Sequence, residues 1–256
     1  MKLGRFSSNE RVFYGRLEGD TVFELADIFN PEIQTEKRHA LNSLTILSPC
    51  QPGKAVCVGL NYMDHIKEFG HDIPSSPVLF IKPSGTVIGC GDFIEYPRSS
   101  RRVDYEAELA VVIKKECRGV SASTAADYIF GYTCANDVTA RDLQQKDGQW
   151  TRGKSFDTFL PLGPYIVTDI DPGKLDIKLY LNGVIKQNSS TSNLIFKVPE
   201  LVAFISEIMT LFPGDVILTG TPSGVGPMCS GDLVEVEIQG LGRLSNRVRG
   251  ATEIGA

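Results

Sequence analysis

Hydrophobic and polar positions alternate in residues 104–113, where the sequence reads DYEAELAVVI. Successive side chains of a strand point to opposite faces, so this period of two predicts a strand. One face carries alanine, leucine and valine, which we expect to pack into a core. The other face carries Glu106 and Glu108, which lie about 6–7 Å apart along such a strand.

Short apolar runs of strand length recur along the rest of the chain. They predict strands at residues 54–60, 78–82, 131–137, 164–168, 175–181, 216–219, 233–238 and 241–248. Asn182-Gly183, directly after the run at 175–181, is the strongest short hairpin signal in the chain. Apolar residues at helical spacing predict a helix over 199–211, and shorter helices are expected at 36–43, 124–128 and 139–146. Many short strands and few helices favour a β-rich α+β fold with a rolled or barrel-like mixed sheet.

The first 52 residues form a separate small unit in this prediction. A turn at Glu18-Gly19-Asp20 joins two alternating segments and indicates a hairpin. Ser48-Pro49 and Gln51-Pro52-Gly53 then interrupt the pattern. We therefore expect a small β-rich N-terminal domain at 1–52 and a larger domain at 53–256.

Composition excludes several classes of protein. The 256-residue chain carries a net charge of −5 without a basic run, so nucleic acid and anionic membranes are not expected partners. No apolar stretch approaches the ~20 residues of a membrane span, and no signal-peptide pattern follows the first methionine. The six cysteines form no CxxC pair, which favours reduced thiols and a cytoplasmic protein.

The paired glutamates need an explanation, because two carboxylates on a half-buried strand repel each other and cost desolvation energy. A solvated edge strand is the ordinary alternative, since glutamate is mostly exposed. Asp137 ends the strand predicted at 131–137 and could add a third carboxylate, although an aspartate there could also cap the next helix. Three oxygen ligands with open positions suit Mg²⁺ or Mn²⁺.

Candidate bases and cations lie in two other segments. His65 and Glu68 are three residues apart, so on a helix they are neighbours and the carboxylate could orient the imidazole as a general base. A surface ion pair is the alternative. Lys154 follows a glycine near the single tryptophan and could lie at the site, or it could be a solvated loop lysine. The Gly- and Thr-rich segment 218–227, which includes Thr221, could bind a carboxylate or form a tight structural turn.

Taken together, five motifs resemble the fumarylacetoacetate hydrolase family, in particular its compact acylpyruvate hydrolase and oxaloacetate decarboxylase type. The resemblance spans roughly residues 53–249. The motifs are GLNY with His65 and Glu68, DYEAELA at 104–110, GY through NDVTARD at 131–142, KSFD at 154–157, and PGD through TGTP with GVG at 213–226.

The resemblance implies a mixed β-roll fold, a homodimer and a site for Mg²⁺ or Mn²⁺. Its metal ligands would be Glu106, Glu108 and Asp137. The catalytic residues would be His65, Glu68 and Lys154. Arg141, Gln144 and Thr221 would bind the substrate.

The chemistry expected of such a site is metal-dependent cleavage of a carbon–carbon bond in a small 2-oxo acid. A divalent cation acts as a Lewis acid toward the developing enolate. Acylpyruvate hydrolysis and oxaloacetate decarboxylation both fit. The first alternative is an isomerase or decarboxylase of an unsaturated 2-oxo dicarboxylate, of the 5-carboxymethyl-2-hydroxymuconate or 2-hydroxyhepta-2,4-diene-1,7-dioate type, in aromatic degradation. The second is a non-catalytic binding protein on the same fold, since fold alone does not imply activity.

Overall fold

The computed structural model describes residues 1–9, 11–64 and 72–250. Its largest sheet has the strand order β4-β3-β2-β1-β14-β12-β11-β17-β6-β7, with β5 paired to β1 and β8 paired to β14. The strands are β1 (Lys2–Ser8), β2 (Arg11–Glu18), β3 (Thr21–Leu25), β4 (Gln34–Ala40), β5 (Thr45–Leu47), β6 (Lys54–Gly59), β7 (Val78–Pro83), β8 (Val87–Ile88), β11 (Ala107–Ile113), β12 (Ile129–Asn136), β14 (Leu160–Val167) and β17 (Val216–Leu218).

Two smaller sheets complete the strands of the described chain. The first has the order β13-β10-β18 and the second the order β16-β15-β19-β20-β9. Their strands are β9 (Phe93–Tyr96), β10 (Val103–Tyr105), β13 (Thr139–Ala140), β15 (Asp176–Leu181), β16 (Val184–Ser190), β18 (Gly226–Met228), β19 (Leu233–Ile238) and β20 (Gly242–Gly250). The prediction of a β-rich fold is confirmed, and within the described residues the mixed sheets do not close into a barrel.

The hairpin predicted at Asn182-Gly183 is confirmed. It joins β15 to β16, and both residues have positive φ, 52° and 79°, which asparagine and glycine tolerate best. The turn at Gly19 likewise joins β2 to β3, with φ of 56°.

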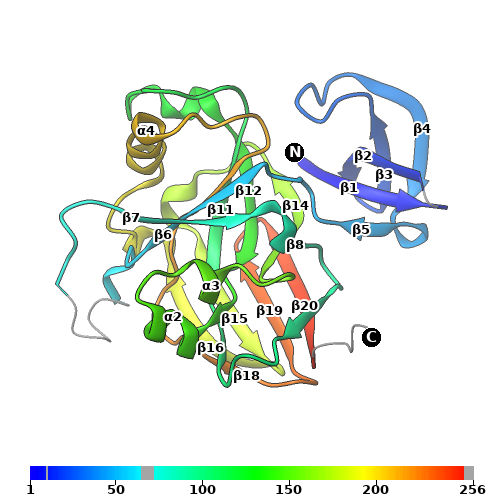
Figure 1. Ribbon diagram of the computed structural model, residues 1–256. Helices are drawn as coiled ribbons and strands as arrows, with labels where there is room; N and C mark the ends of the chain where they lie inside the picture. The colour runs from blue at the N-terminus through cyan, green and yellow to red at the C-terminus, as the bar shows by residue number, and fades with distance from the viewer. Residues whose placement is uncertain (10, 65–71, 251–256) are drawn as a thin grey trace.

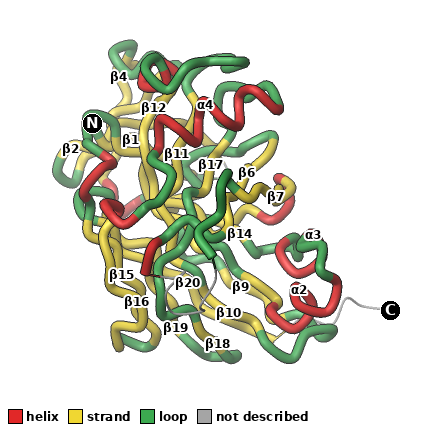
Figure 2. Tube along the Cα trace, turned by 90° about the vertical axis from the view of Figure 1, so that its left-hand side faces the viewer, coloured by secondary structure: helices red, strands yellow, loops and turns green. Residues whose placement is uncertain are grey.

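Helical segments are few in the described chain and lie around the strands (Figure 2). They are α2 (Arg141–Asp147), α3 (Thr151–Lys154) and α4 (Val198–Ile208), with 3₁₀ turns at Leu41–Ser43, Ser84–Thr86, Ala125–Tyr128, Pro172–Lys174 and Thr191–Asn193. The α4 prediction is confirmed, with Pro199 in its first turn. The helix expected at 36–43 is wrong, because residues 36–40 pair with β3 as strand β4 and only the last three residues turn.

The first five strands form a head beside the rest of the molecule (Figure 1). The head is β-rich, as expected. However, β1 also pairs with β14, with Lys2 opposite Val167 and Leu3 opposite Ile166. Hydrogen bonding therefore continues from the head into the sheet that carries the site.

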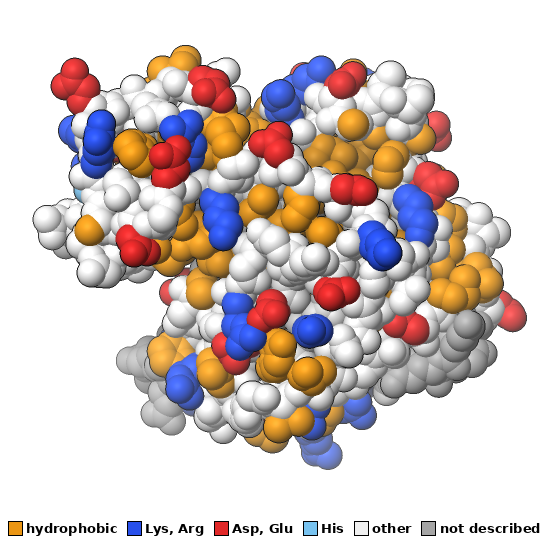
Figure 3. Space-filling model, turned by 180° about the vertical axis from the view of Figure 1, so that it is seen from behind, with side chains coloured by type: hydrophobic (Ala, Val, Ile, Leu, Met, Phe, Trp, Pro, Cys, Tyr) orange, Lys and Arg blue, Asp and Glu red, His pale blue; other side chains and the backbone are white. Residues whose placement is uncertain are grey.

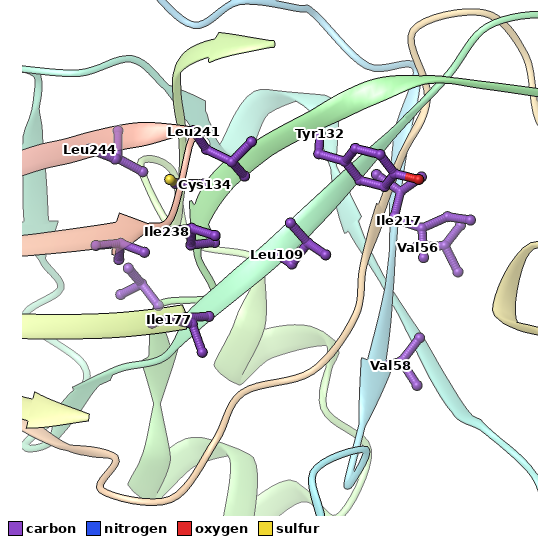
Figure 4. Packing of buried hydrophobic residues seen from close by; sticks show 14 of the residues in the cluster. Val56, Val58, Leu109, Tyr132, Cys134, Ile177, Ile217, Ile238, Leu241 and Leu244 are labelled. Carbon is purple, nitrogen blue, oxygen red and sulfur yellow. The ribbon is translucent and has the colours of Figure 1, made fainter. Parts of the chain in front are cut away.

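The main core lies where β11 and β12 of the large sheet face the five-stranded sheet. Leu109 from β11, Ile177 from β15 and Ile238 from β19 are fully or almost fully buried in one cluster (Figure 4). Burial of one such side chain contributes about 1.5–3 kcal/mol. The opposite face of β11 is also buried, through Ala110 and Val112 in a second cluster. The strand is thus interior, between β12 and β17, and the solvated-edge alternative is wrong.

The surface shown in Figure 3 carries Lys and Arg side chains beside Asp and Glu side chains, with hydrophobic atoms scattered among them. No helix of the described chain has the length and apolar character that crossing a membrane requires.

Candidate functional site

Three carboxylates meet where β11 and β12 lie side by side. Glu106 directly precedes β11, Glu108 lies within it, and Asp137 directly follows β12. The antiparallel register places Ala107 opposite Asn136, and the Asp137 amide donates to the Glu106 carbonyl at 2.8 Å. One oxygen from each side chain lies within 4.8 Å of the others, and all three residues are buried. The alternation read from the sequence therefore does bring both glutamates to one site.

Asp137 does not cap the following helix. The N-cap residue of α2 is Ala140, and it makes no side-chain capping bond. The Asp137 carboxylate instead accepts hydrogen bonds from two buried lysines. Lys82 Nζ lies 2.5 Å from Oδ1 and Lys154 Nζ lies 2.6 Å from Oδ2.

Lys154 is a buried residue of the site, which rules out the solvated-loop alternative. It ends the short helix α3, its side chain is 3% exposed, and its Nζ also lies 2.8 Å from Glu106 Oε2. Burial alone would lower the pKa of Lys154, but the charges of Asp137 and Glu106 outweigh it and raise that pKa. The ammonium therefore stays charged between two carboxylates.

Arg141 and Asp104 form a second layer beside the triad. Arg141 is the first residue of α2 and donates to Asp104 Oδ2 at 2.9 Å, to Gln144 Oε1 at 2.7 Å and to Glu106 Oε1. Asp104 is fully buried and also accepts two bonds from Arg102. One buried carboxylate thus orients two guanidinium groups.

The two glutamates differ in protonation. Burial raises the pKa of Glu108, and the negative charges of Asp137 and Glu106 raise it further. For Glu106 the burial effect is outweighed by Lys154 and Arg141, which lower its pKa. Glu108 therefore holds a proton to higher pH than Glu106 in the protein without a metal ion.

The Gly- and Thr-rich segment after β17 does bind a carboxylate, but that carboxylate belongs to the protein. The Gly220 amide donates to Glu108 Oε2 at 2.6 Å. Thr221 accepts from Gln187 Nε2 at 2.9 Å, and the Gln187 carbonyl oxygen accepts from the Ala107 amide. This segment fixes the position of Glu108 from the opposite side.

A cavity of about 410 Å³ opens above the triad. Its polar wall includes Arg102, Asp104, Arg141 and Gln144, and its lining also includes Thr221. Its apolar wall includes Val58, Leu60, Phe80, Trp150 and Val225.

The apolar wall depends on a glycine. The rings of Phe80 and Trp150 meet edge to face, with centroids 5.3 Å apart. A Cβ atom at Gly59 would lie 2.7 Å from a Trp150 ring carbon. Glycine therefore lets the indole ring approach β6 closely.

The structure brings together most of the residues predicted from the sequence. Glu106, Glu108, Asp137, Lys154, Arg141, Gln144 and Thr221 all line the cavity. His65 and Glu68 lie outside the described residues.

Sequence reasoning missed Lys82, Arg102 and Gln187, and it gave Asp104 no role. Arg102 and Asp104 occupy alternate positions in line with Glu106 and Glu108. The same period of two could therefore have predicted that they lie at the site. Lys82 carried only a weak signal, as the charged end of an apolar run, and Gln187 carried none.

A buried acidic cluster at the floor of a cavity, held within a β-rich mixed-sheet fold, is the arrangement of an enzyme with a candidate metal centre. The chain belongs to the fumarylacetoacetate (FAA) hydrolase C-terminal family, whose pattern matches residues 54–249, and it is an enzyme of that family. Residues 1–49 match a second family, described as Rv2993c-like, N-terminal.

Three relatives illustrate the range of named activities. The solved structure of 2-hydroxyhepta-2,4-diene-1,7-dioate isomerase from Mycobacterium marinum is 43% identical, covers 99% of this chain and 100% of its own, and has a TM-score of 0.92. The structure of 5-carboxymethyl-2-hydroxymuconate delta-isomerase from Mycobacterium smegmatis is 43% identical, covers 98% of this chain and 100% of its own, and has a TM-score of 0.93. Mitochondrial oxaloacetate tautomerase Fahd2a from Rattus norvegicus is 44% identical over 81% of this chain and 70% of its own.

The acidic triad fits a divalent cation. Each carboxylate oxygen can accept more than one partner, and Glu108 Oε1 has no hydrogen bond within the described residues. Carboxylate oxygens are the ligands that Mg²⁺ and Mn²⁺ prefer.

Proposed function

We propose that this protein is a divalent-metal enzyme that acts on small 2-oxo acids through enolate chemistry, with carbon–carbon bond cleavage as its reaction. The observation that carries the proposal is the triad of Glu106, Glu108 and Asp137 at the floor of the cavity. Glu106 and Asp137 have ion-pair partners, whereas within the described residues Glu108 accepts only from the Gly220 amide, so its buried charge is costly without a further positive partner. Members of the family generally use a divalent metal.

In this proposal Glu106, Glu108 and Asp137 hold Mg²⁺ or Mn²⁺, which supplies Lewis-acid stabilisation of negative charge on the substrate. Lys154 places a second positive charge beside the same carboxylates and stabilises negative charge on the reacting carbonyl oxygen. Its position between two fixed partners means that little reorganisation is needed during the reaction.

Arg141, Gln144 and Thr221 bind the substrate in this proposal. Arg141 still has N–H donors beyond the three bonds that hold it, and Gln144 is fixed by Arg141 itself. A carboxylate is the group that such donors recognise best. The apolar wall formed by Phe80 and Trp150 then limits the access of water from the opposite side.

The proposed general base is His65, oriented by Glu68. This assignment rests only on their spacing of three residues in the sequence. For an acylpyruvate, His65 removes a proton from water, which attacks the C4 carbonyl, and the C3–C4 bond breaks to leave the pyruvate enolate and a free acid. For oxaloacetate the C4 carboxylate departs as CO₂ and no water is needed. We also propose a homodimer in the cytoplasm, with no nucleic acid or membrane partner.

A second candidate reaction is isomerisation, because the relatives at 43–44% identity are named as two isomerases and a tautomerase. Such reactions move a proton between carbon and oxygen or between two carbons of a 2-oxo acid. The same base and the same cationic site serve that step.

A substrate panel in Mg²⁺ separates the candidates. Acetylpyruvate, oxaloacetate and 2-hydroxyhepta-2,4-diene-1,7-dioate are each followed by ultraviolet absorbance and product analysis, with EDTA-treated protein as the control. Cleavage products from either of the first two, lost in EDTA, support the leading reaction. Isomerised products without cleavage support the second. Turnover unchanged by EDTA contradicts the role of the metal, and no turnover of any of the three contradicts the proposal.

To test the base, His65→Ala is compared with wild-type protein on acetylpyruvate. We expect hydrolysis to fall by about 10²–10⁴-fold, the usual contribution of a general base, while Mn²⁺ binding is retained. Hydrolysis at the native rate would show that another group activates the water.

A further inference from the structure

The polar wall of the cavity contains a cation that the chemistry above does not use. Arg102, Asp104, Glu106 and Glu108 occupy alternate positions, and all four line the cavity. The intervening residues Val103, Tyr105 and Ala107 belong to the hydrophobic core. Arg102 is therefore the outermost member of the row of side chains that ends in the candidate metal ligands.

Arg102 differs from the other cations of the cavity in its accessibility. Its side chain is 52% exposed, against 17% for Arg141 and 3% for Lys154. Arg102 donates two hydrogen bonds to Asp104, from Nε at 2.9 Å and from Nη2 at 3.3 Å. Within the described part of the chain, Nη1 makes no hydrogen bond, so this group has donors available for an anion.

The charges of the described site, with Lys82 included, are compatible with a doubly charged ligand. The described lining holds four carboxylates, namely Asp104, Glu106, Glu108 and Asp137. Arg102, Arg141 and Lys154 line it with them, and Lys82 pairs with Asp137 from behind, which gives four cations. A bound divalent cation would leave two positive charges, and a dicarboxylate neutralises both, whereas a monocarboxylate leaves one.

The position of Arg102 sets where the second carboxylate must lie. Arg102 lies four positions before Glu106, which corresponds to at most about 13 Å between Cα atoms, and its guanidinium shares the Asp104 carboxylate with Arg141. A 2-oxo acid whose first carboxylate and 2-oxo oxygen lie at the triad must extend along the polar wall to reach Arg102. Of the 2-oxo dicarboxylic acids considered above, the seven-carbon diacid has the longer reach and oxaloacetate, with four carbons, the shorter.

We propose that Arg102 is the specificity-determining residue of this site and that it binds the distal carboxylate of a 2-oxo dicarboxylic acid. The proposal rests on the proposed function, because it takes the triad as the place where the 2-oxo acid end is bound. It assigns to the guanidinium a bidentate, charge-assisted contact of the kind that arginine makes with carboxylates. Asp104 holds the group by its Nε edge and leaves the Nη1 side for the ligand.

The test compares two ligands that differ only in the second carboxylate, 2-oxoheptanedioate and 2-oxoheptanoate. Binding of each to the Mn²⁺-loaded protein is measured by calorimetry, which needs no turnover. Wild-type protein should bind the diacid at least about ten-fold more tightly, as expected for one charge-assisted contact. Arg102→Gln should remove this preference and leave the affinity for the monoacid within about two-fold, and Arg102→Lys should restore part of it.

Arg152→Gln is the matched control, because Arg152 is also half exposed, at 51%, and also pairs with an aspartate, Asp147. It should leave the preference for the diacid unchanged. A wild-type protein that binds both ligands equally, or an Arg102→Gln variant that keeps the preference, overturns the proposal. So does an equal loss for both ligands, which would mean that Arg102 acts only by orienting Asp104.

The outcome is separable from the proposed function, which is tested by turnover of the substrate panel. Turnover of 2-oxo acids without diacid selectivity rejects the role of Arg102 alone. Failure of both ligands to bind, together with no turnover, rejects both proposals.

Discussion

Lys82 and Asp137 form an ion pair inside the protein, with Nζ 2.5 Å from Oδ1 and side chains that are 0% and 1% exposed. Lys82 also donates to the Val138 carbonyl at 2.9 Å. Asp137 is thereby held between Lys82 on one oxygen and Lys154 on the other. This arrangement offsets part of the cost of burying three carboxylates together.

Removing the buried cation should destabilise the protein. Lys82→Met leaves Asp137 with a single cationic partner, and breaking a buried pair costs roughly 3–5 kcal/mol. The measurement is urea unfolding of the metal-free variant and wild type. Arg152→Gln, which breaks the exposed pair with Asp147, should leave the unfolding transition nearly unchanged, because exposed ion pairs contribute little to stability. Equal stability of Lys82→Met and wild type would show that the pair does not stabilise the fold.

The carboxylate triad should determine metal affinity. Asp137→Asn and Glu108→Gln each remove a charged oxygen ligand. Mn²⁺ affinity measured by calorimetry should therefore fall by more than about 100-fold, which exceeds the loss typical of changing a residue behind the metal ligands. Asp147→Asn changes an aspartate outside the cavity lining and should leave the affinity unchanged. Unchanged Mn²⁺ affinity in both triad variants would show that the metal site lies elsewhere.

Stability of the metal-free protein should depend on pH through Glu108. Burial and the neighbouring carboxylates raise its pKa above the ordinary 4.5, so between 4.5 and the raised pKa the folded state binds more protons than the unfolded state. The stability that Glu108 contributes is present below 4.5 and is lost as pH rises through the raised pKa.

The Glu108→Gln variant isolates this effect. In EDTA, the melting temperature of the variant relative to wild type should increase as pH rises above 4.5, because the amide cannot ionise. Glu106 has a lowered pKa, so its contribution is lost only as pH falls below 4.5 and does not enter this window. Parallel melting curves for the two proteins across this range would refute the assignment.

Asp104 should act by positioning Arg141. Asp104→Asn removes the negative charge that accepts from Arg141 Nε at 2.9 Å, so the guanidinium is less firmly held toward Glu106 and Gln144. We expect kcat/KM on the best panel substrate to fall roughly 10–100-fold, a size typical of groups behind metal ligands. The effect should appear for mono- and dicarboxylic substrates alike. Loss confined to dicarboxylates would mean that Asp104 serves Arg102 alone.

The apolar wall offers a spectroscopic test. Trp150 is the single tryptophan of the chain and lines the cavity, so its fluorescence reports on the site. Gly59→Ala would place a Cβ atom 2.7 Å from the indole and displace it, shifting the emission maximum. Gly19→Ala, at an exposed turn with open space around it, should leave the emission unchanged. An unshifted spectrum in Gly59→Ala would show that the indole does not pack on β6.

The period of two around Glu106 and Glu108 was enough to predict a strand, and the order of the motifs was enough to predict the family and its β-rich fold. Turns were readable as well, because Asn182-Gly183 carries its backbone preference in its own residue types. The helix expected at 36–43 failed because its tertiary pairing with β3 overrides a weak local propensity.

Only the tertiary structure decided what surrounds the triad. Lys82 and Gln187 lie far from their partners along the chain, and no local pattern relates a lysine on β7 to Asp137 or a glutamine on β16 to the Ala107 amide of β11. The sequence also did not reveal the difference between Glu106 and Glu108, because two identical side chains two residues apart acquire opposite pKa shifts from their separate neighbours. Spacing along a strand determines which face a side chain occupies, whereas burial and contacts between distant segments determine its charge.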